Sequence, residues 1–425
     1  MSGITDLVRH VELPKFYRVK QKFSHEKLSE EEIVKTVSHD FLRCAEGKIL
    51  PGQKICITCG SRGISNMPLV TKTLVTLVRE MGADPFLVPA MGSHGGATDE
   101  GQLEMLRGVG ISEETMGCKI YSSMEPVLLG QAGNCPVYLD RYAAQADGII
   151  VLNRVKAHTA FRWNYESGLM KMMAVGLGKQ KGAEVCHEMG EDYMGERIEC
   201  IGKAILQMAP IVMGVAILEN AFDQTAEVCV IPAERIAEEE PPLLLRAKER
   251  MGKIFLDSCD ILIVRAIGKN YSGAGADPNI VGRCANPKIS AGVKCQRMGF
   301  FDLSDASHGN ATGIGRADII SRRLFEKMDF DNTYPNFITC NTPDTFKIPV
   351  VAANDEEVLK TCITTCVKID HAHPRIIMLD NSLEIETILI SEAMLEEAKT
   401  HERLFVQDGP FSLEFDSAGT MITKI

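Results

Sequence analysis

Three histidines in this 425-residue chain stand where an imidazole could act on a bound ligand. His94 and His158 each lie in a loop beside glycine or basic residues. Histidine titrates near neutrality, so two of them facing one substrate can alternate as general base and general acid. His187 is a candidate ligand for a soft or borderline metal, although one histidine does not specify the metal.

Lys171 is the candidate nucleophile. It lies among Met170, Met172 and Met173, where desolvation would lower the pKa of its amine and free a lone pair. The competing interpretation is a helix lysine whose ammonium group reaches solvent along the apolar surface. Position in the sequence leaves both interpretations open.

A parallel sheet would bring these residues together. Buried strands are predicted over residues 54–59, 85–89 and 147–153, with a helix over 67–81 between the first two. The carboxyl ends of parallel strands meet at one edge, where ligands bind. The loops after these strands carry Ser61, Arg62, His94, Gly95 and His158. Backbone N–H groups of the first two loops could hold an anion.

The second half of the chain repeats the α/β pattern. A strand over 261–266, a glycine-rich loop over 268–282, a helix over 358–367 and a strand over 375–379 are predicted. The acidic, proline-containing stretch 238–242, together with a charged helix predicted over 243–253, looks like a connection between domains. We therefore expect two α/β domains with largely parallel sheets, residues 1–245 and 246–425, and an active site in the cleft between them.

Composition restricts the function. A formal charge of −11 argues against nucleic acid as the main ligand, because that affinity comes from clustered basic residues. No apolar run is long enough to span a membrane, and the start lacks a signal-peptide pattern, so a cytoplasmic protein is expected. The 14 cysteines should then be thiols, and we interpret Cys56 and Cys59 as core residues.

The order of the motifs resembles the nickel-pincer lactate racemase family and its wider set of 2-hydroxyacid racemases and epimerases. The resemblance covers most of residues 50–220 and the architecture beyond. It rests on the order and spacing of Ser61-Arg62, Gly92-Ser93-His94-Gly95, Lys156-Ala157-His158-Thr159, Gly168-Leu169-Met170-Lys171, Gly176-Leu177-Gly178-Lys179 and the later His187.

The resemblance implies a role for each of these residues. Lys171 would attach covalently to a pyridinium-3,5-bisthiocarboxylic acid mononucleotide, and His187 would bind its nickel ion. His94 and His158 would be the two acid/base histidines. Ser61, Arg62 and Gly95 would lie near the cofactor, with Arg62 also facing the substrate.

The reaction implied by the family is racemisation or epimerisation of a 2-hydroxy acid through reversible hydride transfer to the cofactor. The partners would be a small hydroxy acid and cofactor-maturation proteins, and the sequence leaves a homo-oligomer open. The family's glutamine and lysine that would hold the lactate carboxylate are replaced near Gly282 and Ala285. Lys269 and Arg283 are the candidates to substitute for them, which favours a substrate other than lactate.

Two alternatives to this isomerase remain. One is a metal-dependent lyase or hydratase with His94, His158 and His187 around a divalent ion. The other is a non-catalytic relative that binds the nucleotide only.

Overall fold

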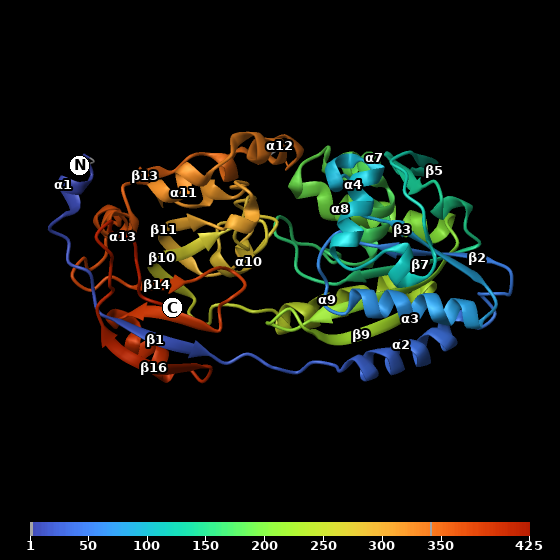
Figure 1. Cartoon of the computed structure of the whole chain (residues 1–425), viewed down its shortest axis with the longest axis horizontal. Coiled ribbons are helices and arrows are strands. Elements are labelled where there is room, and N and C mark those ends of the chain that lie inside the picture. Colours follow the sequence, from blue (N-terminus) through green and yellow to red (C-terminus); the bar gives the residue numbers. More distant parts are fainter. Residues whose placement is uncertain (1–2, 341) are drawn as a thin grey trace. The chain divides into compact units, whose positions relative to one another are not determined.

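The structure, a computed structural model, describes residues 3–340 and 342–425 and contains two compact units (Figure 1). The first unit is Ser24–Met251. The second unit combines the stretch that ends at Phe23 with Gly252–Ile425. Both are α/β with large, mostly parallel sheets, so the predicted fold class is confirmed. The location of an active site between the units stays a prediction.

The N-terminal stretch lies in the second unit, which differs from the predicted boundary of 1–245 and 246–425. Strand β1 (Phe16–Gln21) pairs antiparallel with β15 (Thr387–Ser391) and with β16 (Leu404–Phe411). These long-range backbone hydrogen bonds tie the start of the chain to its end. No local pattern in a sequence reports such a pairing, because strand partners are chosen by tertiary contacts.

The first unit has a six-stranded sheet in the order β4-β3-β2-β7-β8-β9. All pairings are parallel except that of β8 with β9. The strands are β2 (Lys54–Cys59), β3 (Asp84–Pro89), β4 (Lys119–Ile120), β7 (Gly148–Arg154), β8 (Ile211–Glu219) and β9 (Thr225–Pro232), with a separate hairpin of β5 (Pro126–Ala132) and β6 (Cys135–Asp140).

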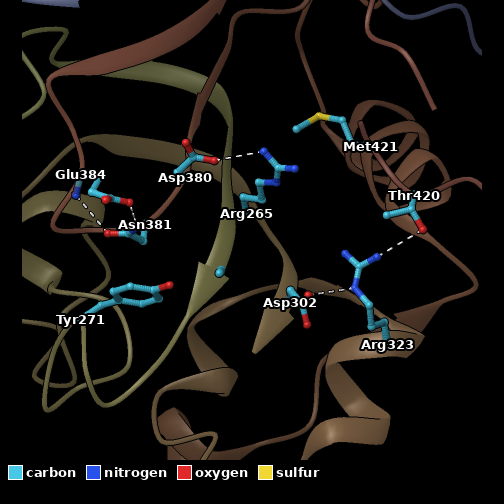
Figure 2. A pocket seen from close by; sticks show the side chains of 10 residues that line it. Arg265, Tyr271, Asp302, Arg323, Asp380, Asn381, Glu384, Thr420 and Met421 are labelled. Atoms are coloured by element: carbon cyan, nitrogen blue, oxygen red, sulfur yellow. Dashed lines mark hydrogen bonds and ion pairs between the residues drawn. The ribbon is translucent and has the colours of Figure 1, made fainter. Parts of the chain in front are cut away.

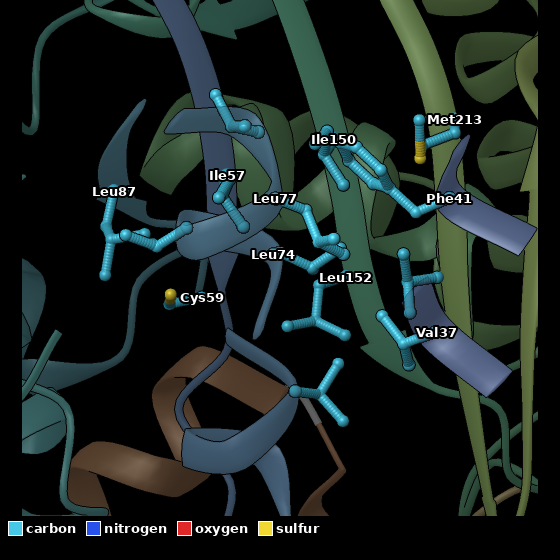
Figure 3. Packing of buried hydrophobic residues seen from close by; sticks show 14 of the residues in the cluster. Val37, Phe41, Ile57, Cys59, Leu74, Leu77, Leu87, Ile150, Leu152 and Met213 are labelled. Carbon is cyan, nitrogen blue, oxygen red and sulfur yellow. The ribbon is translucent and has the colours of Figure 1, made fainter. Parts of the chain in front are cut away.

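Helices α2 and α3 cover one face of this sheet (Figure 1). A capping box of Ser29 and Glu32 starts α2. Figure 3 shows Phe41 of α2 and Leu74 of α3 packed with Ile150 and Leu152 of β7, all fully buried. The helices of this unit are α2 (Glu30–Ala45), α3 (Met67–Glu80), α4 (Asp99–Gly108), α5 (Glu113–Met116), α6 (Leu169–Lys171), α7 (Lys179–His187), α8 (Glu191–Met208) and α9 (Ile236–Arg250).

The stretch 238–242 is helical, and its helix ends at Arg250, directly before the boundary between the two units. It lies inside α9, with Pro241 and Pro242 in the helix. Proline has no N–H to donate to the carbonyl four residues earlier. The hydroxyl of Tyr165 donates to that carbonyl, of Ala237, at 2.6 Å. A side chain distant in sequence thus compensates for the proline, which sequence patterns could not show.

The second unit has an eight-stranded sheet in the order β13-β12-β11-β10-β14-β15-β1-β16. The pairings from β13 to β14 are parallel and the others antiparallel. Its further strands are β10 (Ser258–Ile267), β11 (Lys294–Leu303), β12 (Ile319–Ser321), β13 (Val350–Ala352) and β14 (Ile376–Leu379). Its helices are α1 (Thr5–Val8), α10 (Pro278–Val281), α11 (Arg322–Lys327), α12 (Phe330–Cys340), α13 (Asp355–Thr365) and α14 (Leu395–Thr400).

Two expectations from composition can be compared with the structure. Cys56 and Cys59 are both fully buried thiols in β2, in agreement with core packing. Burial raises the pKa of both thiols. Across residues 3–340 and 342–425, no helix combines the length and apolar character needed to cross a membrane.

Candidate functional site

The loops after β2, β3 and β7 meet at the segment that carries Lys171. The amide of Asn153, in β7, donates to the carbonyl of Gly168 at 2.9 Å. The N–H of Gly92, after β3, donates to the carbonyl of Gly176 at 3.3 Å. After β2, a Cβ on Gly60 would lie 3.3 Å from the side chain of Met172. The structure therefore brings the three strand ends together, as the βαβ pattern predicts.

Lys171 contacts His158 directly. Its Nζ lies 2.6 Å from Nε2 of His158. The other ring nitrogen of His158, Nδ1, accepts a hydrogen bond from the backbone N–H of Ala160 at 3.1 Å. The ring of Phe161 packs 4.2 Å from the imidazole, between centroids, and 6.0 Å from the Lys171 amine. Lys171 stands at the junction of α6 with a π-helical turn, η3 (Met172–Leu177), a geometry that is frequent at functional sites.

A buried carboxylate holds the His158 loop. Oε2 of Glu166 accepts the backbone N–H of His158 at 2.7 Å and lies 3.4 Å from Arg162. Its Oε1 pairs with Lys248 of α9 at 2.6 Å. The side chain of Glu166 is fully buried, so these contacts replace the water that an ionised carboxylate requires. Helix α9 thereby fixes the position of His158.

Two adjacent residues of the β2 loop reach both histidines. The hydroxyl of Ser61 lies 2.5 Å from Nδ1 of His94. The charge of Arg62 contributes to lowering the pKa of His158. Because Ser61 and Arg62 are consecutive, His94 and His158 both lie near the same loop. Arg62 itself makes no hydrogen bond or ion pair with any residue that the structure describes.

The carboxylate of Glu219 contacts both the backbone of this loop and the neighbouring Arg154. Glu219 of β8 accepts the N–H of Ser65 at 2.8 Å and forms an ion pair with Arg154. Burial, followed by the nearby Arg154, lowers the pKa of Arg62. Arg154 is paired with Glu219, whereas Arg62 has no ion pair among the described residues, so its guanidinium could pair with an anionic ligand.

His158 and His187 are both neutral at pH 7. Burial, and then the charges of Lys171, His187, Arg162 and Arg62, hold the pKa of His158 well below its usual range. Burial and Lys171 lower the pKa of His187 to about 4. Each imidazole therefore keeps a lone pair at physiological pH.

His187, the last residue of α7, has the chemistry of a metal ligand. Its imidazole makes no hydrogen bond with the described residues, and its neutral state leaves a nitrogen free to coordinate. Within the described part of the chain, no group of three or more His, Cys, Asp or Glu side chains could hold a metal ion. A metal here would take its remaining ligands from a bound cofactor.

Gly95 shapes the loop of His94. It adopts a φ of +68°, and a Cβ at this position would lie 2.6 Å from the backbone nitrogen of Gln102. The buried amide of Gln102 donates to the carbonyls of Gly92 and His94 at 2.9 and 3.2 Å. The loop is therefore held in one conformation by α4.

The two substrate candidates of the second half lie in the second unit. The guanidinium of Arg283 donates to the carbonyls of Arg316 and Gln296 and pairs with Asp318 at 2.6 Å. Burial acts to lower the pKa of Arg283, but Asp318 and Cys295 together outweigh it and raise this pKa above its ordinary value. The amine of Lys269 donates to the carbonyl of Gly273 at 3.0 Å. Both bind backbone of their own unit, and a role toward the substrate stays a prediction.

Three residues of the site were missed from the sequence. Glu166 and Asn153 support His158 and Gly168 as described above. Glu240 is fully buried, and it accepts the N–H of Met170 at 2.9 Å, next to Lys171. Asn153 is the last residue of a predicted strand, and a polar residue at that position could have indicated a role at the site. Glu240 stands in an acidic run that is typical of a solvated linker, so nothing in the sequence marked it.

The chain is a two-unit α/β protein, and its candidate site lies at the carboxyl ends of parallel strands of the first unit. No protein-family model matches the chain, and no curated protein matches it in sequence. Among solved structures, it is similar to the lactate racemase apoprotein from Thermoanaerobacterium thermosaccharolyticum. The TM-score is 0.48 and the identity 14%, over 81% of this chain and 90% of that chain.

Proposed function

We propose that this protein is a racemase or epimerase of a 2-hydroxy acid and that it carries a nickel-pincer nucleotide attached through Lys171. The observation that carries the proposal is the 2.6 Å contact between the Lys171 amine and Nε2 of His158. In this contact a candidate nucleophile and a candidate acid/base group lie side by side, close to Arg62, which has no ion pair among the described residues.

The residues present suit such a cofactor. Lys171 supplies the amine for attachment, and His187 supplies a neutral imidazole without a hydrogen bond for the metal. Arg62 would bind the nucleotide phosphate or the substrate carboxylate. When bound, such a group would supply reversible hydride-transfer chemistry at the α-carbon of the substrate.

The two histidines would take part through different ring nitrogens. If Nδ1–H of His94 donates to Ser61, the lone pair of the neutral ring lies on Nε2, which would take the proton of the substrate hydroxyl. Nδ1 of His158 accepts from Ala160, so the proton of the neutral ring lies on Nε2 and can hydrogen-bond to a substrate oxygen. When His158 instead acts as the base through Nε2, its proton must move to Nδ1, and the hydrogen bond from the Ala160 N–H must be broken.

The test is intact mass spectrometry with metal analysis on full-length protein co-expressed with pincer-cofactor maturation enzymes. The wild type should carry nickel and an adduct of nucleotide size, and Lys171→Ala should carry neither. Lys203→Ala is the matched control, because Lys203 is a surface lysine paired with Glu199. Absence of adduct and nickel in the wild type, with a lactate racemase loaded in parallel, would refute the proposal.

The two alternatives make different predictions in the same experiment. A lyase with three histidines around a divalent ion needs a ligand group that residues 3–340 and 342–425 do not provide. A non-catalytic nucleotide-binding protein would load the cofactor, yet convert no enantiomer of any 2-hydroxy acid offered. Racemisation by the loaded wild type, lost in His94→Ala and His158→Ala with the adduct retained, separates the enzyme from the binding protein.

A further inference from the structure

The second unit contains a pocket at the point where its strand order reverses. From β10 the chain proceeds outward through β11, β12 and β13 and then returns to β14, on the other side of β10. In doubly wound sheets, ligands bind at the carboxyl ends of the strands beside such a reversal. A pocket of about 370 Å³ lies there, lined by Arg265 of β10, Asp302 of β11 and Asp380 after β14 (Figure 2).

Both arginines of the pocket are already paired with carboxylates of its lining. Arg265 lies 3.2 Å from Oδ1 of Asp380, and Arg323 lies 3.1 Å from Asp302, as the dashed lines in Figure 2 mark. Glu384 adds a third carboxylate, which accepts the amide of Asn381 at 2.7 Å. Three carboxylates face two guanidinium groups, so the lining has a small excess of negative charge.

Several polar atoms of the lining remain available. The hydroxyl of Tyr271 makes no hydrogen bond with any residue in the described part of the chain. Only Oδ1 of Asp380 is engaged by Arg265, and Oε2 of Glu384 by Asn381, which leaves one oxygen of each carboxylate without a partner among residues 3–340 and 342–425. Burial raises the pKa of Asp380, and Arg265 opposes this effect. A ligand that donates to these oxygens would relieve part of the desolvation cost.

We propose that this pocket binds a small neutral polyhydroxylated molecule, such as a monosaccharide with vicinal hydroxyls. A hydroxyl both donates and accepts. Such a ligand can donate to Asp380 and Glu384 and accept from Tyr271 without breaking either ion pair. An anion would meet the excess of carboxylates, and a cation would meet the two arginines. The site lies within the second unit and does not depend on the function proposed for the first.

The test uses the full-length, cofactor-free protein with D-glucose and D-ribose as probes and D-gluconate as the anionic comparison. Binding is followed by saturation-transfer NMR and titration calorimetry. At least one neutral sugar should bind saturably and more tightly than D-gluconate. Failure of both sugars, or a preference for D-gluconate, would overturn the proposal. Since no cofactor is present, neither result bears on the racemase.

Two tyrosine substitutions test whether the sugar binds in this pocket. Tyr271→Phe removes only the hydroxyl that has no partner, so the fold should be unaffected, and the sugar affinity should fall about fivefold, as for one hydrogen bond. Tyr334→Phe is the matched control, because Tyr334 is an exposed tyrosine of α12 outside the lining. Equal affinities of the wild type and Tyr271→Phe would reject this pocket as the site.

Discussion

The amine of Lys171 lies 2.6 Å from Nε2 of His158, and Nδ1 of the same ring accepts the backbone N–H of Ala160. A neutral imidazole that accepts at Nδ1 carries its proton on Nε2. That proton can be shared with Lys171 only if the amine offers a lone pair. The contact therefore favours the uncharged amine, the state in which a lysine is a nucleophile, over the ammonium form of Lys171, whose charge lowers the pKa of His158 and of His187.

Lys171 should react with amine reagents at neutral pH faster than other lysines. Trace acetylation at pH 7 with peptide mass spectrometry measures this, and Lys203 is the reference, because its hydrogen bond to Glu199 raises its pKa. We expect Lys171 to be modified at least about tenfold faster, the effect of one pKa unit on the neutral fraction. The excess should shrink in His158→Phe. Modification of Lys171 no faster than Lys203 would contradict an uncharged amine.

Glu166→Gln should destabilise the first unit by about 1 to 3 kcal/mol, because Lys248 and Arg162 lose a buried carboxylate. Both partners keep some contact with water, which limits the cost. Urea unfolding measures the change. Glu125→Gln, which removes an exposed pair with Arg141, should change stability by less than about 0.5 kcal/mol. Equal effects of the two substitutions would show that Glu166 does not brace the His158 loop.

The parallel sheet of the first unit could be predicted from the sequence because its strands are short and apolar, and segments with the apolar periodicity of helices lie between them. The predicted strands over 54–59 and 147–153 correspond to β2 and β7, whose ends deliver Arg62 and His158. The sequence did not predict that β1 lies in the second unit. Its partners, β15 and β16, lie more than 350 residues away in sequence.

Some candidate site residues could be predicted from the sequence and others could not. His94 and His158 were predicted as site residues because they follow predicted strands and stand beside glycine or basic residues, and Lys171 because methionines surround it. Glu240 was not, since burial converts an acid of a hydrophilic run into a group that holds the backbone beside Lys171. Tyr165 was not, because its role depends on a carbonyl freed by Pro241 of another element.

Gly168→Ala should disturb the segment that carries Lys171. Gly168 has an extended backbone that any residue could adopt, but a Cβ there would lie 1.9 Å from Oε1 of the buried Glu240. Moving Glu240 would strain its bond to Met170, and we expect a loss of about 1 to 3 kcal/mol in stability. Gly108→Ala in α4, where a Cβ would meet nothing within 4 Å, should not destabilise the protein. Thermal unfolding of both variants compares these outcomes, and a neutral Gly168→Ala would contradict the close packing.

Glu240 should make the protein less stable as pH rises. Burial raises the pKa of its carboxyl to about 8, although hydrogen bonds from the backbone N–H groups of Met170 and Leu169 act to lower it. The charge of an ionised Glu240 acts in turn to raise the pKa of Tyr165. Between about pH 4.5 and 8, the folded chain keeps a proton that the unfolded chain has released. The free energy of unfolding therefore falls through this window, by on the order of a few kcal/mol.

Glu240→Gln should remove most of this slope, because a glutamine stays neutral in both states. Glu238→Gln is the matched control, since Glu238 is an exposed acid of the same helix and its replacement should leave the slope unchanged. Urea unfolding at half-unit steps from pH 5 to 8.5 measures all three proteins. If the wild type and Glu240→Gln lose stability in parallel, Glu240 is ionised throughout, and the segment before Lys171 is held by a carboxylate instead of a neutral acid.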